Sequence, residues 1–287
     1  MTNQTLAIVG GSGLYKLDGL INEKEHIVET PFGAPSSPII SGRLGNTKLL
    51  FLARHGLGHV LAPHEVNYKA NIFALKRLGA EAIISVSAVG SMREDIHPGD
   101  LVVVDQYIDR TKSRPSTFFG DGIVGHVMFA DPVCPVLSER VYAAATTLKG
   151  TVHKGGTLMV MEGPAFSTRA ESLMHRQLGV DMIGMTAMPE AKLAREAELC
   201  YCTLALATDY DSWREEKEAV TVAAVLEIMR NNVQKAQSVI EIIAKEGLSR
   251  KADCACAEAL QFAVVTDRKM ISKETTNKMS TIFGRIL

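Results

Sequence analysis

Three segments that each follow a predicted strand combine glycine with side chains suited to binding an anion. Residues 10–14 (GGSGL) are a glycine-rich turn, residues 53–56 (ARHG) place Arg54 and His55 at a strand end, and residues 85–91 (SVSAVGS) offer hydroxyls and backbone amides. N–H groups exposed in a glycine turn can hold a phosphate, and the planar guanidinium of arginine matches its oxygens. Each segment alone is also compatible with a tight turn or a salt bridge. Because ligands collect at the carboxyl ends of strands in α/β sheets, the three together predict a site for an oxyanion of the phosphate type.

A further predicted strand delivers two carboxylates. Asp209 and Asp211, in the segment ALATDYDSW, are two residues apart and therefore point to the same side of an extended chain. Burial and like charge raise the pKa of one member of such a pair, which suits a general acid; helix capping or solvation of a loop is the alternative. Phe166 follows the turn at Gly163-Pro164 and can stack on a planar ring or cover apolar side chains.

The elements that must position these side chains alternate between strands and helices. Apolar runs predict strands at residues 6–11, 38–45, 47–56, 80–90, 100–109, 156–163, 180–186 and 200–211. Helical patterns predict helices at residues 65–78, 136–148, 168–178, 187–197, 221–246 and about 253–264, with a long loop at 111–134. No repeat or linker divides the chain, so the pattern predicts one α/β domain with a mostly parallel or mixed central sheet.

Length and composition are those of an ordinary globular protein. The chain has 287 residues, of which 46% are hydrophobic and 22% charged, and its formal net charge is -1. This composition excludes disorder as the main state and gives no electrostatic support for binding nucleic acid or an anionic membrane. No apolar run approaches the ~20 residues that span a bilayer, and the N-terminus MTNQTLAIVGG lacks a basic region. We therefore expect a cytoplasmic protein.

The five cysteines give no clear sign of a metal site. Cys134, Cys200 and Cys202 lie in apolar or strand-like surroundings and are expected to be small core residues. Cys254 and Cys256 form a C-x-C pair, but a zinc site needs about four ligands, and neither a second pair nor a histidine cluster is near them in the sequence. The pair is expected to be two surface or half-buried thiols, with a disulfide or redox role as the alternative in a thermophile or an oxidising compartment.

Nine segments in a fixed order carry a resemblance to a known family. They are GGSGL, TPFGAPS, LARHG, HEVNYKANIFALK, SAVGS, PGDLVVVDQYIDRT, GPAFSTRAES, MTAMPEA and ATDYDSW. The chain resembles the trimeric purine nucleoside phosphorylases, in particular their 5′-methylthioadenosine phosphorylase branch, over about residues 5–266. The resemblance implies a single α/β domain at 1–266 with a distorted, barrel-like mixed sheet wrapped by helices. It leaves 267–287 as a C-terminal extension of unknown role.

The resemblance also implies the reaction: phosphate cleaves the N-glycosidic bond of 5′-methylthioadenosine and releases adenine and 5-methylthioribose 1-phosphate. Inorganic phosphate is then a co-substrate, and no metal or organic cofactor is required. The implied phosphate site comprises Ser12, Arg54, His55, the hydroxyl of Ser87, the amide of Ala88, and Thr186. Ser12 and Ser87 stand where many relatives have threonine, and serine keeps the hydroxyl.

The implied nucleoside site joins several segments and two subunits. Phe166, Ser167, Met185, Asp209, Tyr210 and Asp211 would contact the base and ribose, with Asp209 and Asp211 as the catalytic pair. Val222 and Val225 would line an apolar pocket for the 5′ group, although both also fit the core face of their helix. His126 and Val265 would come from the neighbouring subunit of a homotrimer, and His59 would lie near the 5′ end.

The carboxylate at 209 favours a 6-aminopurine. The 6-amino group and a protonated N7 are both donors, and a carboxylate accepts from both, whereas a 6-oxopurine presents an acceptor that a carboxylate repels. Branches that cleave inosine and guanosine place asparagine there. The alternatives are a phosphorylase of the same fold for methylthioinosine, inosine or guanosine, a hydrolase that uses water, and a nucleoside-binding sensor without turnover.

Overall fold

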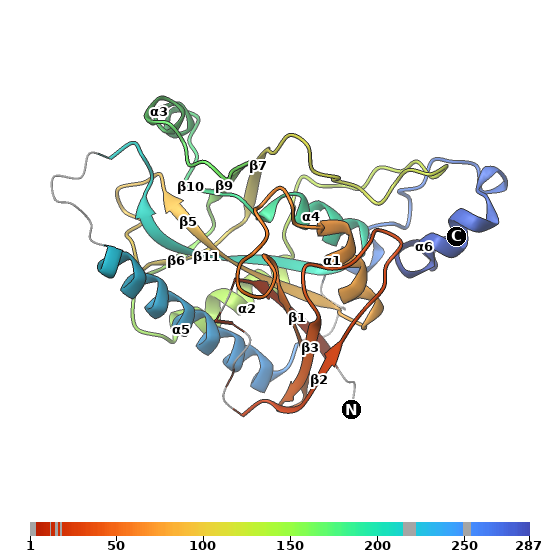
Figure 1. Ribbon diagram of the computed structural model, residues 1–287, viewed down its shortest axis with the longest axis horizontal. Coiled ribbons are helices and arrows are strands. Elements are labelled where there is room, and N and C mark those ends of the chain that lie inside the picture. Colours follow the sequence, from red (N-terminus) through yellow and green to blue (C-terminus); the bar gives the residue numbers. More distant parts are fainter. Residues whose placement is uncertain (1–3, 12, 15–16, 18, 215–221, 249–253) are drawn as a thin grey trace.

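The computed structural model describes residues 4–11, 13–14, 17, 19–214, 222–248 and 254–287, with the backbone alone for 222–226 (Figure 1). The strands are β1 (Gln4–Gly10), β2 (Ile21–His26), β3 (Ile39–Leu44), β4 (Thr47–Ala53), β5 (Ala82–Ser91), β6 (Leu101–Val103), β7 (Gln106–Arg110), β8 (Val152–Lys154), β9 (Thr157–Met161), β10 (Met182–Gly184) and β11 (Cys200–Tyr210). The helices are α1 (Tyr68–Arg77), α2 (Pro135–Thr146), α3 (Arg169–Gln177), α4 (Ala187–Glu196), α5 (Val222–Glu246) and α6 (Lys273–Phe283), with short 3₁₀ turns η2 (Ala255–Glu258) and η3 (Arg268–Met270). The predicted α/β class with a mixed sheet is confirmed.

The strands form one mixed sheet that divides along β5. Its order is β2-β3-β4-β1-β5-β10-β9-β7, while β11 pairs with the other edge of β5 and leads through β6 to β8. On the first edge, residues 82–85 of β5 pair in parallel with β1, and residues 90–91 pair antiparallel with β10. Residues 86–89 lie between these two pairings. We call this place the split in the sheet, because β1 ends and β10 has not yet begun.

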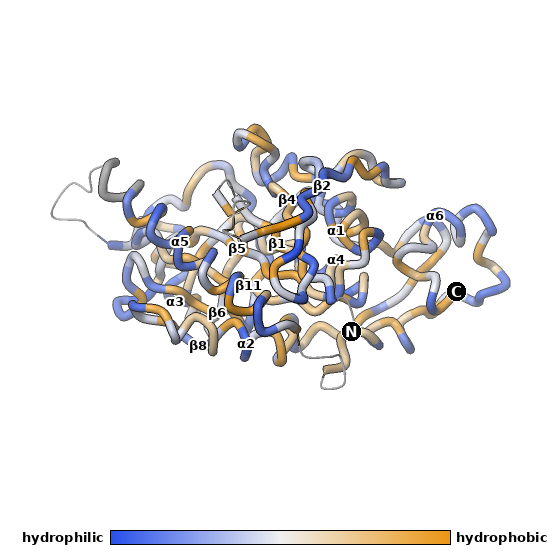
Figure 2. The backbone as a smooth tube through the Cα atoms, turned by 90° about the horizontal axis from the view of Figure 1, so that it is seen from below, coloured by the Kyte–Doolittle hydropathy of each residue, from blue (hydrophilic) through white to orange (hydrophobic). Residues whose placement is uncertain are grey.

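Helices cover both faces of the sheet because its central strands are apolar on both sides. In β1, Ala7 and Val9 belong to the core cluster that includes α1 and α4 residues, whereas Leu6 and Ile8 belong to the cluster with α2 and α5 residues. Such continuous apolar runs are typical of parallel strands buried on both faces. Figure 2 shows the same pattern, with apolar stretches of chain running through the sheet.

Two predicted elements are wrong. The strand expected at 100–109 is in fact two strands. The first, β6, pairs with β11, and the second, β7, pairs with β9. The chain breaks between them at Asp105, which accepts a hydrogen bond from the N–H of Gly156. The helix expected at 253–264 is only the single turn η2. After it, the N–H of His126 donates to the carbonyl of Ala263 and that of Val265 donates to Val124, so the segment pairs with the long loop.

The C-terminal segment contains the helix α6, capped by the hydroxyl of Ser272, which accepts from Thr275 N–H. Met279, Ile282 and Phe283 are buried in the same core cluster as α1 and α4, and the ring of Phe283 stacks on Phe119 at 4.9 Å. This segment is therefore an additional terminal element packed on the core. Within the part of the chain that the structure describes, no helix is long and apolar enough to cross a bilayer.

Candidate active site

Arg54 lies at the split in the sheet, with its side chain 2% exposed. It directly follows β4, and its backbone N–H donates to the carbonyl of Gly10 at the end of β1. Its Nη2 donates to the hydroxyl of Ser85 at 2.7 Å, and Nη1 donates to the carbonyl of Val86 at 3.1 Å. Among the described residues, this contact uses one of the two N–H groups of Nη1, so the other is available to a bound anion.

Glu190, which the sequence analysis did not assign, holds the guanidinium of Arg54. The carboxylate is 1% exposed and accepts from Nε at 2.9 Å and from Nη2 at 3.2 Å. It also accepts from the hydroxyls of Ser85 and Tyr201. Burial opposes the charge of Arg54, but the contact with Glu190 more than compensates and raises the pKa of the guanidinium. The only signal in the sequence was the motif MTAMPEA, which places an acidic residue in the first turn of the helix that follows a strand.

His55 is buried beside Arg54 and neutral. Its Nδ1 lies 2.9 Å from the carbonyl oxygen of Leu61, which can only accept, so Nδ1 carries the proton and Nε2 is an acceptor. Its ring stacks on His59, with 4.3 Å between centroids. Burial lowers the pKa of His55 to about 4, assisted by the charge of Arg54.

The lowered pKa of His55 makes stability depend on pH. Between about 6.5, the ordinary value, and about 4, the unfolded chain binds more protons at this residue than the folded chain. The contribution is therefore fully present above pH 6.5 and is lost as the pH falls toward 4, by at most about 3 kcal/mol. Urea unfolding without phosphate at pH 7.5 and 4.5 should show a smaller loss for His55→Gln than for the unchanged protein. Equal losses would contradict a buried, neutral His55.

Two hydroxyls and the exposed residue Ala88 lie at the split. The hydroxyl of Ser87, on β5, lies 2.9 Å from that of Thr186, which precedes α4. Ala88 is exposed and belongs to the stretch of β5 that lies between the pairings with β1 and β10. The structure thus brings together Arg54, Ser87 and Thr186 of the predicted phosphate site. Ser12, the remaining predicted hydroxyl, lies outside the described residues.

Asp209 and Asp211 stand at the end of β11, next to β5. A bulge between Ala207 and Asp209 shifts the register there, and a Cβ atom on Gly90 would be 3.4 Å from both Asp209 Oδ2 and Asp211 Cβ. Asp211 is 6% exposed, and its buried Oδ2 has no hydrogen-bond partner among the described residues. Leaving such an oxygen unpaired is costly, so the site is suited to a ligand that offers a donor. Tyr210, between them, packs its ring on Trp213 instead.

The turn between β9 and α3 lies over Met185. A Cβ atom on Gly163 would be 2.6 Å from the sulfur of Met185. Phe166 is 80% exposed, whereas Ser167 is buried and its carbonyl accepts from the hydroxyl of Ser212, just after β11. The turn therefore joins Met185 to the region of the carboxylate pair and leaves the ring of Phe166 accessible to a ligand.

Arg114, in the long loop, fixes this turn and is a second residue that the sequence analysis missed. Its Nη1 donates to the carbonyls of Met185 and Met188, and its Nη2 donates to the carbonyl of Glu162. One buried guanidinium thus joins the turn after β9 to the turn after β10. Nothing in its sequence context indicates this role, because all three carbonyls are distant along the chain.

His126 and Val265 are not part of this cluster. They lie on the ribbon formed by residues 124–126 and 263–266, where His126 is exposed and Val265 is 63% exposed. The ribbon extends toward the end of the molecule that carries α6, whereas α5 begins at the opposite end (Figures 1 and 2). Val222 and Val225 stand in the first turn of α5, and their side chains lie outside the described part.

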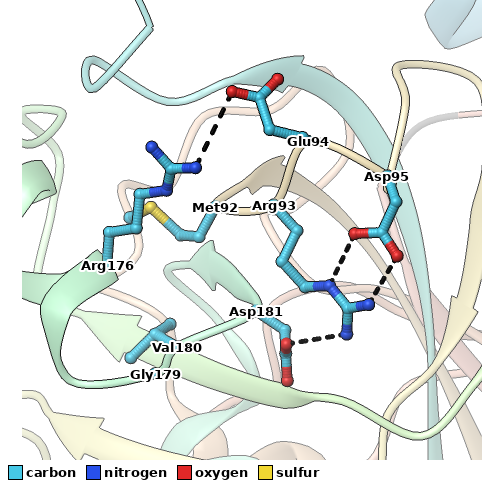
Figure 3. Close-up of a pocket in the computed structure, with 8 residues that line it drawn as sticks. All are labelled: Met92, Arg93, Glu94, Asp95, Arg176, Gly179, Val180 and Asp181. Atoms are coloured by element: carbon cyan, nitrogen blue, oxygen red, sulfur yellow. Dashed lines mark hydrogen bonds and ion pairs between the residues drawn. The ribbon is translucent and has the colours of Figure 1, made fainter.

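A shallow pocket of about 250 Å³ lies beyond β5 and is lined by residues 92–95, Arg176 and 179–181 (Figure 3). Within it, Arg93 pairs with Asp95 at 2.5 Å and with Asp181 at 3.1 Å, so its charge is already balanced. None of the predicted site residues lines this pocket.

Comparisons with known proteins agree with the predicted resemblance. A model of the phosphorylase superfamily matches residues 5–245. The S-methyl-5'-thioadenosine phosphorylase of Geobacter sulfurreducens is 53% identical over 282 residues, covering 98% of both chains. A methylthioadenosine phosphorylase from an antarctic soil metagenomic library superposes with a TM-score of 0.93 at 45% identity, over 98% of this chain and 99% of that one.

A more distant structure has a ligand bound. The methylthioadenosine phosphorylase of Schistosoma mansoni in complex with tubercidin is 35% identical and superposes with a TM-score of 0.82, over 90% of this chain and 96% of that one. Matches of this length and identity, together with the family model, establish common descent over the whole fold. The chain therefore belongs to the phosphorylase superfamily and, within it, to the methylthioadenosine phosphorylase family.

Proposed function

We propose that this chain catalyses the phosphorolysis of 5′-methylthioadenosine to adenine and 5-methylthioribose 1-phosphate, in the cytoplasm, as a step of purine and methionine salvage. Relatives that bear this activity in their names match the chain from end to end at 53% and 49% identity. The observation that carries the choice of base is the carboxylate pair at the end of β11, where a buried oxygen of Asp211 has no hydrogen-bond partner among the residues that the structure describes. A 6-aminopurine brings the donors that such oxygens require.

Phosphate is proposed to bind at the split in the sheet. The second N–H of Arg54 Nη1 and the hydroxyls of Ser87 and Thr186 would donate to the anion, and the amide of Ala88 and the hydroxyl of Ser12 would add two further donors. His55 is neutral there, so its Nε2 would accept a hydrogen bond from a protonated phosphate oxygen. Glu190 and Ser85 fix the guanidinium from behind, so that it does not have to reorganise when the anion binds.

The reaction requires that phosphate be held close to the positive charge that develops on the ribose. As the bond between C1′ and N9 breaks, its electron pair goes to the base and positive charge develops on the ribose, as in glycoside hydrolysis. Phosphate held below C1′ stabilises that charge. One of its oxygens then donates an electron pair to C1′ and forms the new C–O bond. Asp209 hydrogen-bonds N7 and assists its protonation, which makes adenine a better leaving group.

The 5′ methylthio group is proposed to lie against Val222 and Val225, with His126 and Val265 of a neighbouring copy closing the pocket in a homotrimer. A single chain holds the ribbon and the start of α5 at opposite ends (Figure 1). Within one chain these residues cannot meet. Next to the ribbon in the sequence, Met128 and Phe262 are 83% and 89% exposed, an apolar surface of the kind that interfaces cover. Sedimentation equilibrium at assay concentration tests the assembly.

A substrate panel with and without phosphate tests the reaction. We expect adenine release from methylthioadenosine only when phosphate is present, and about 10²-fold or more slower release of hypoxanthine from methylthioinosine. Faster turnover of methylthioinosine would contradict the choice of base. Turnover in phosphate-free buffer would indicate a hydrolase, and tight binding without turnover would indicate a sensor.

A further inference from the structure

Four of the five cysteines converge far from the proposed active site. Cys134 caps the start of α2, Cys200 opens β11, and Cys254 and Cys256 stand at the start of η2. Their sulfur atoms all lie within 4.8 Å of one another. Cys200 and Asp209 are at opposite ends of β11, about 30 Å apart at the rise of a strand. No second pair or histidine cluster is near the C-x-C pair in the sequence, but the fold brings Cys134 and Cys200 to it from distant segments.

The arrangement of the sulfur atoms matches a tetrahedral metal site. Four thiolates at about 2.3 Å from a zinc ion are separated from one another by about 3.8 Å. Here Sγ of Cys200 and Sγ of Cys254 are 3.6 Å apart, and all five cysteines are free thiols. Cys254 has an extended backbone, with φ -141° and ψ 148°. The chain turns into η2 directly after Cys254, and the sulfur atoms of Cys254 and Cys256 both lie within the cluster, where they can bind one ion.

The surroundings of the cluster favour negative charge. The N–H of Leu137, in the first turn of α2, donates to the sulfur of Cys134 at 3.5 Å, and a helix N-terminus stabilises a thiolate. Four thiolates whose sulfur atoms lie within 4.8 Å of one another repel each other strongly, and a divalent cation compensates that charge.

We propose that Cys134, Cys200, Cys254 and Cys256 bind one zinc ion as a structural site. Thiolates in tetrahedral geometry select zinc among the common divalent cations, and four protein ligands leave no open position for catalysis. On binding, the thiol protons go to water and the filled site is dianionic. The ion joins the segment after α5 to the start of β11, and that segment continues into the ribbon that bears Val265.

Metal analysis of the full-length protein, purified without chelators, tests the site. We expect about one zinc ion per chain, released when a mercurial reagent blocks the thiols. Cobalt exchanged into the protein should give the intense sulfur-to-metal bands of tetrahedral thiolate coordination. The Cys254→Ser/Cys256→Ser variant should lose the metal and unfold at a lower temperature. Cys202→Ala is the matched control and should keep it, because Cys202 lies on the same strand as Cys200 but outside the cluster.

Three results would overturn the proposal. The first is protein that contains no zinc and whose intact mass, measured without reductant, is four hydrogens below that of the fully reduced chain, as two disulfides require. The second is a reduced protein with free thiols that takes up no zinc when zinc is added. The third is a cobalt spectrum like that of the hydrated ion. The cobalt spectrum of the unchanged protein decides the question even where the double variant does not fold.

Discussion

The Asp209→Asn variant is expected to cleave methylthioadenosine with a kcat/KM about 10²–10³-fold below that of the unchanged protein. Asparagine keeps the shape of the side chain but replaces one acceptor oxygen with an NH₂ donor. That donor faces the donors of a 6-aminopurine, and the amide cannot assist protonation of N7. For methylthioinosine the donor instead faces the 6-oxo acceptor, so the ratio of the two activities should shift toward methylthioinosine.

Initial rates on both nucleosides at saturating phosphate measure this effect. Asp95→Asn is the matched control, because Asp95 is an exposed carboxylate paired with Arg93 outside the proposed site, and such pairs contribute little. It should leave both rates unchanged. If Asp209→Asn retained its rate on methylthioadenosine, or lost both activities in equal proportion, the contact between Asp209 and the base would be refuted.

The Arg54→Met variant is expected to lose phosphorolysis and to lower the free energy of unfolding by about 3–5 kcal/mol. The stability loss follows from Glu190, whose carboxylate is 1% exposed and would lose its bonds to Nε and Nη2 of Arg54. Ser85 and Tyr201 would remain as donors to it, but neither neutralises its charge. The loss of activity follows from the missing donor to phosphate.

The Arg54→Met/Glu190→Met double variant separates these two effects. Removing both charges leaves no unpaired buried ion, and replacing a buried pair by apolar side chains is often neutral or stabilising. We expect the double variant to recover most of the stability in urea unfolding without phosphate, and none of the activity. If the double variant recovered phosphorolysis, Arg54 would have only a structural role and would not bind phosphate. A single variant as stable as the unchanged protein would contradict the buried ion pair.

The strands at the centre of the sheet could be predicted because their signal is local. The runs that became β1, β4, β5 and β11 are apolar on both faces, and burial between two layers of helices requires that pattern. The run at 100–109 carries the same signal but crosses between two parts of the sheet, and its break at Asp105 depends on a hydrogen bond to Gly156, far along the chain. The hydrophobic pattern of the segment contains no information about a hydrogen-bond partner that is distant in the sequence.

The C-terminal segment shows the converse error. Its alanines and apolar residues around 255–264 predict a helix, yet the chain makes only one 3₁₀ turn and then pairs with the loop near Gly125. Pairing with that loop, together with the position of Cys254 and Cys256 beside Cys134 and Cys200, outweighs a weak local preference. Helix propensity describes an isolated segment and does not include the tertiary contacts that compete with the helix.

The sequence by itself determined the chemistry available to this protein: an arginine, hydroxyls and glycine turns for an anion, and two carboxylates for an amino-bearing base. It also determined the family, through the order of its motifs. Only the tertiary structure decided that Glu190, 136 residues from Arg54, orients the guanidinium, that Arg114 joins two turns, and that four cysteines meet. The reason is physical. Side-chain type and spacing act over one or two turns of chain, whereas a buried ion pair or a thiol cluster exists only when strand register and crossovers bring distant segments within bonding distance.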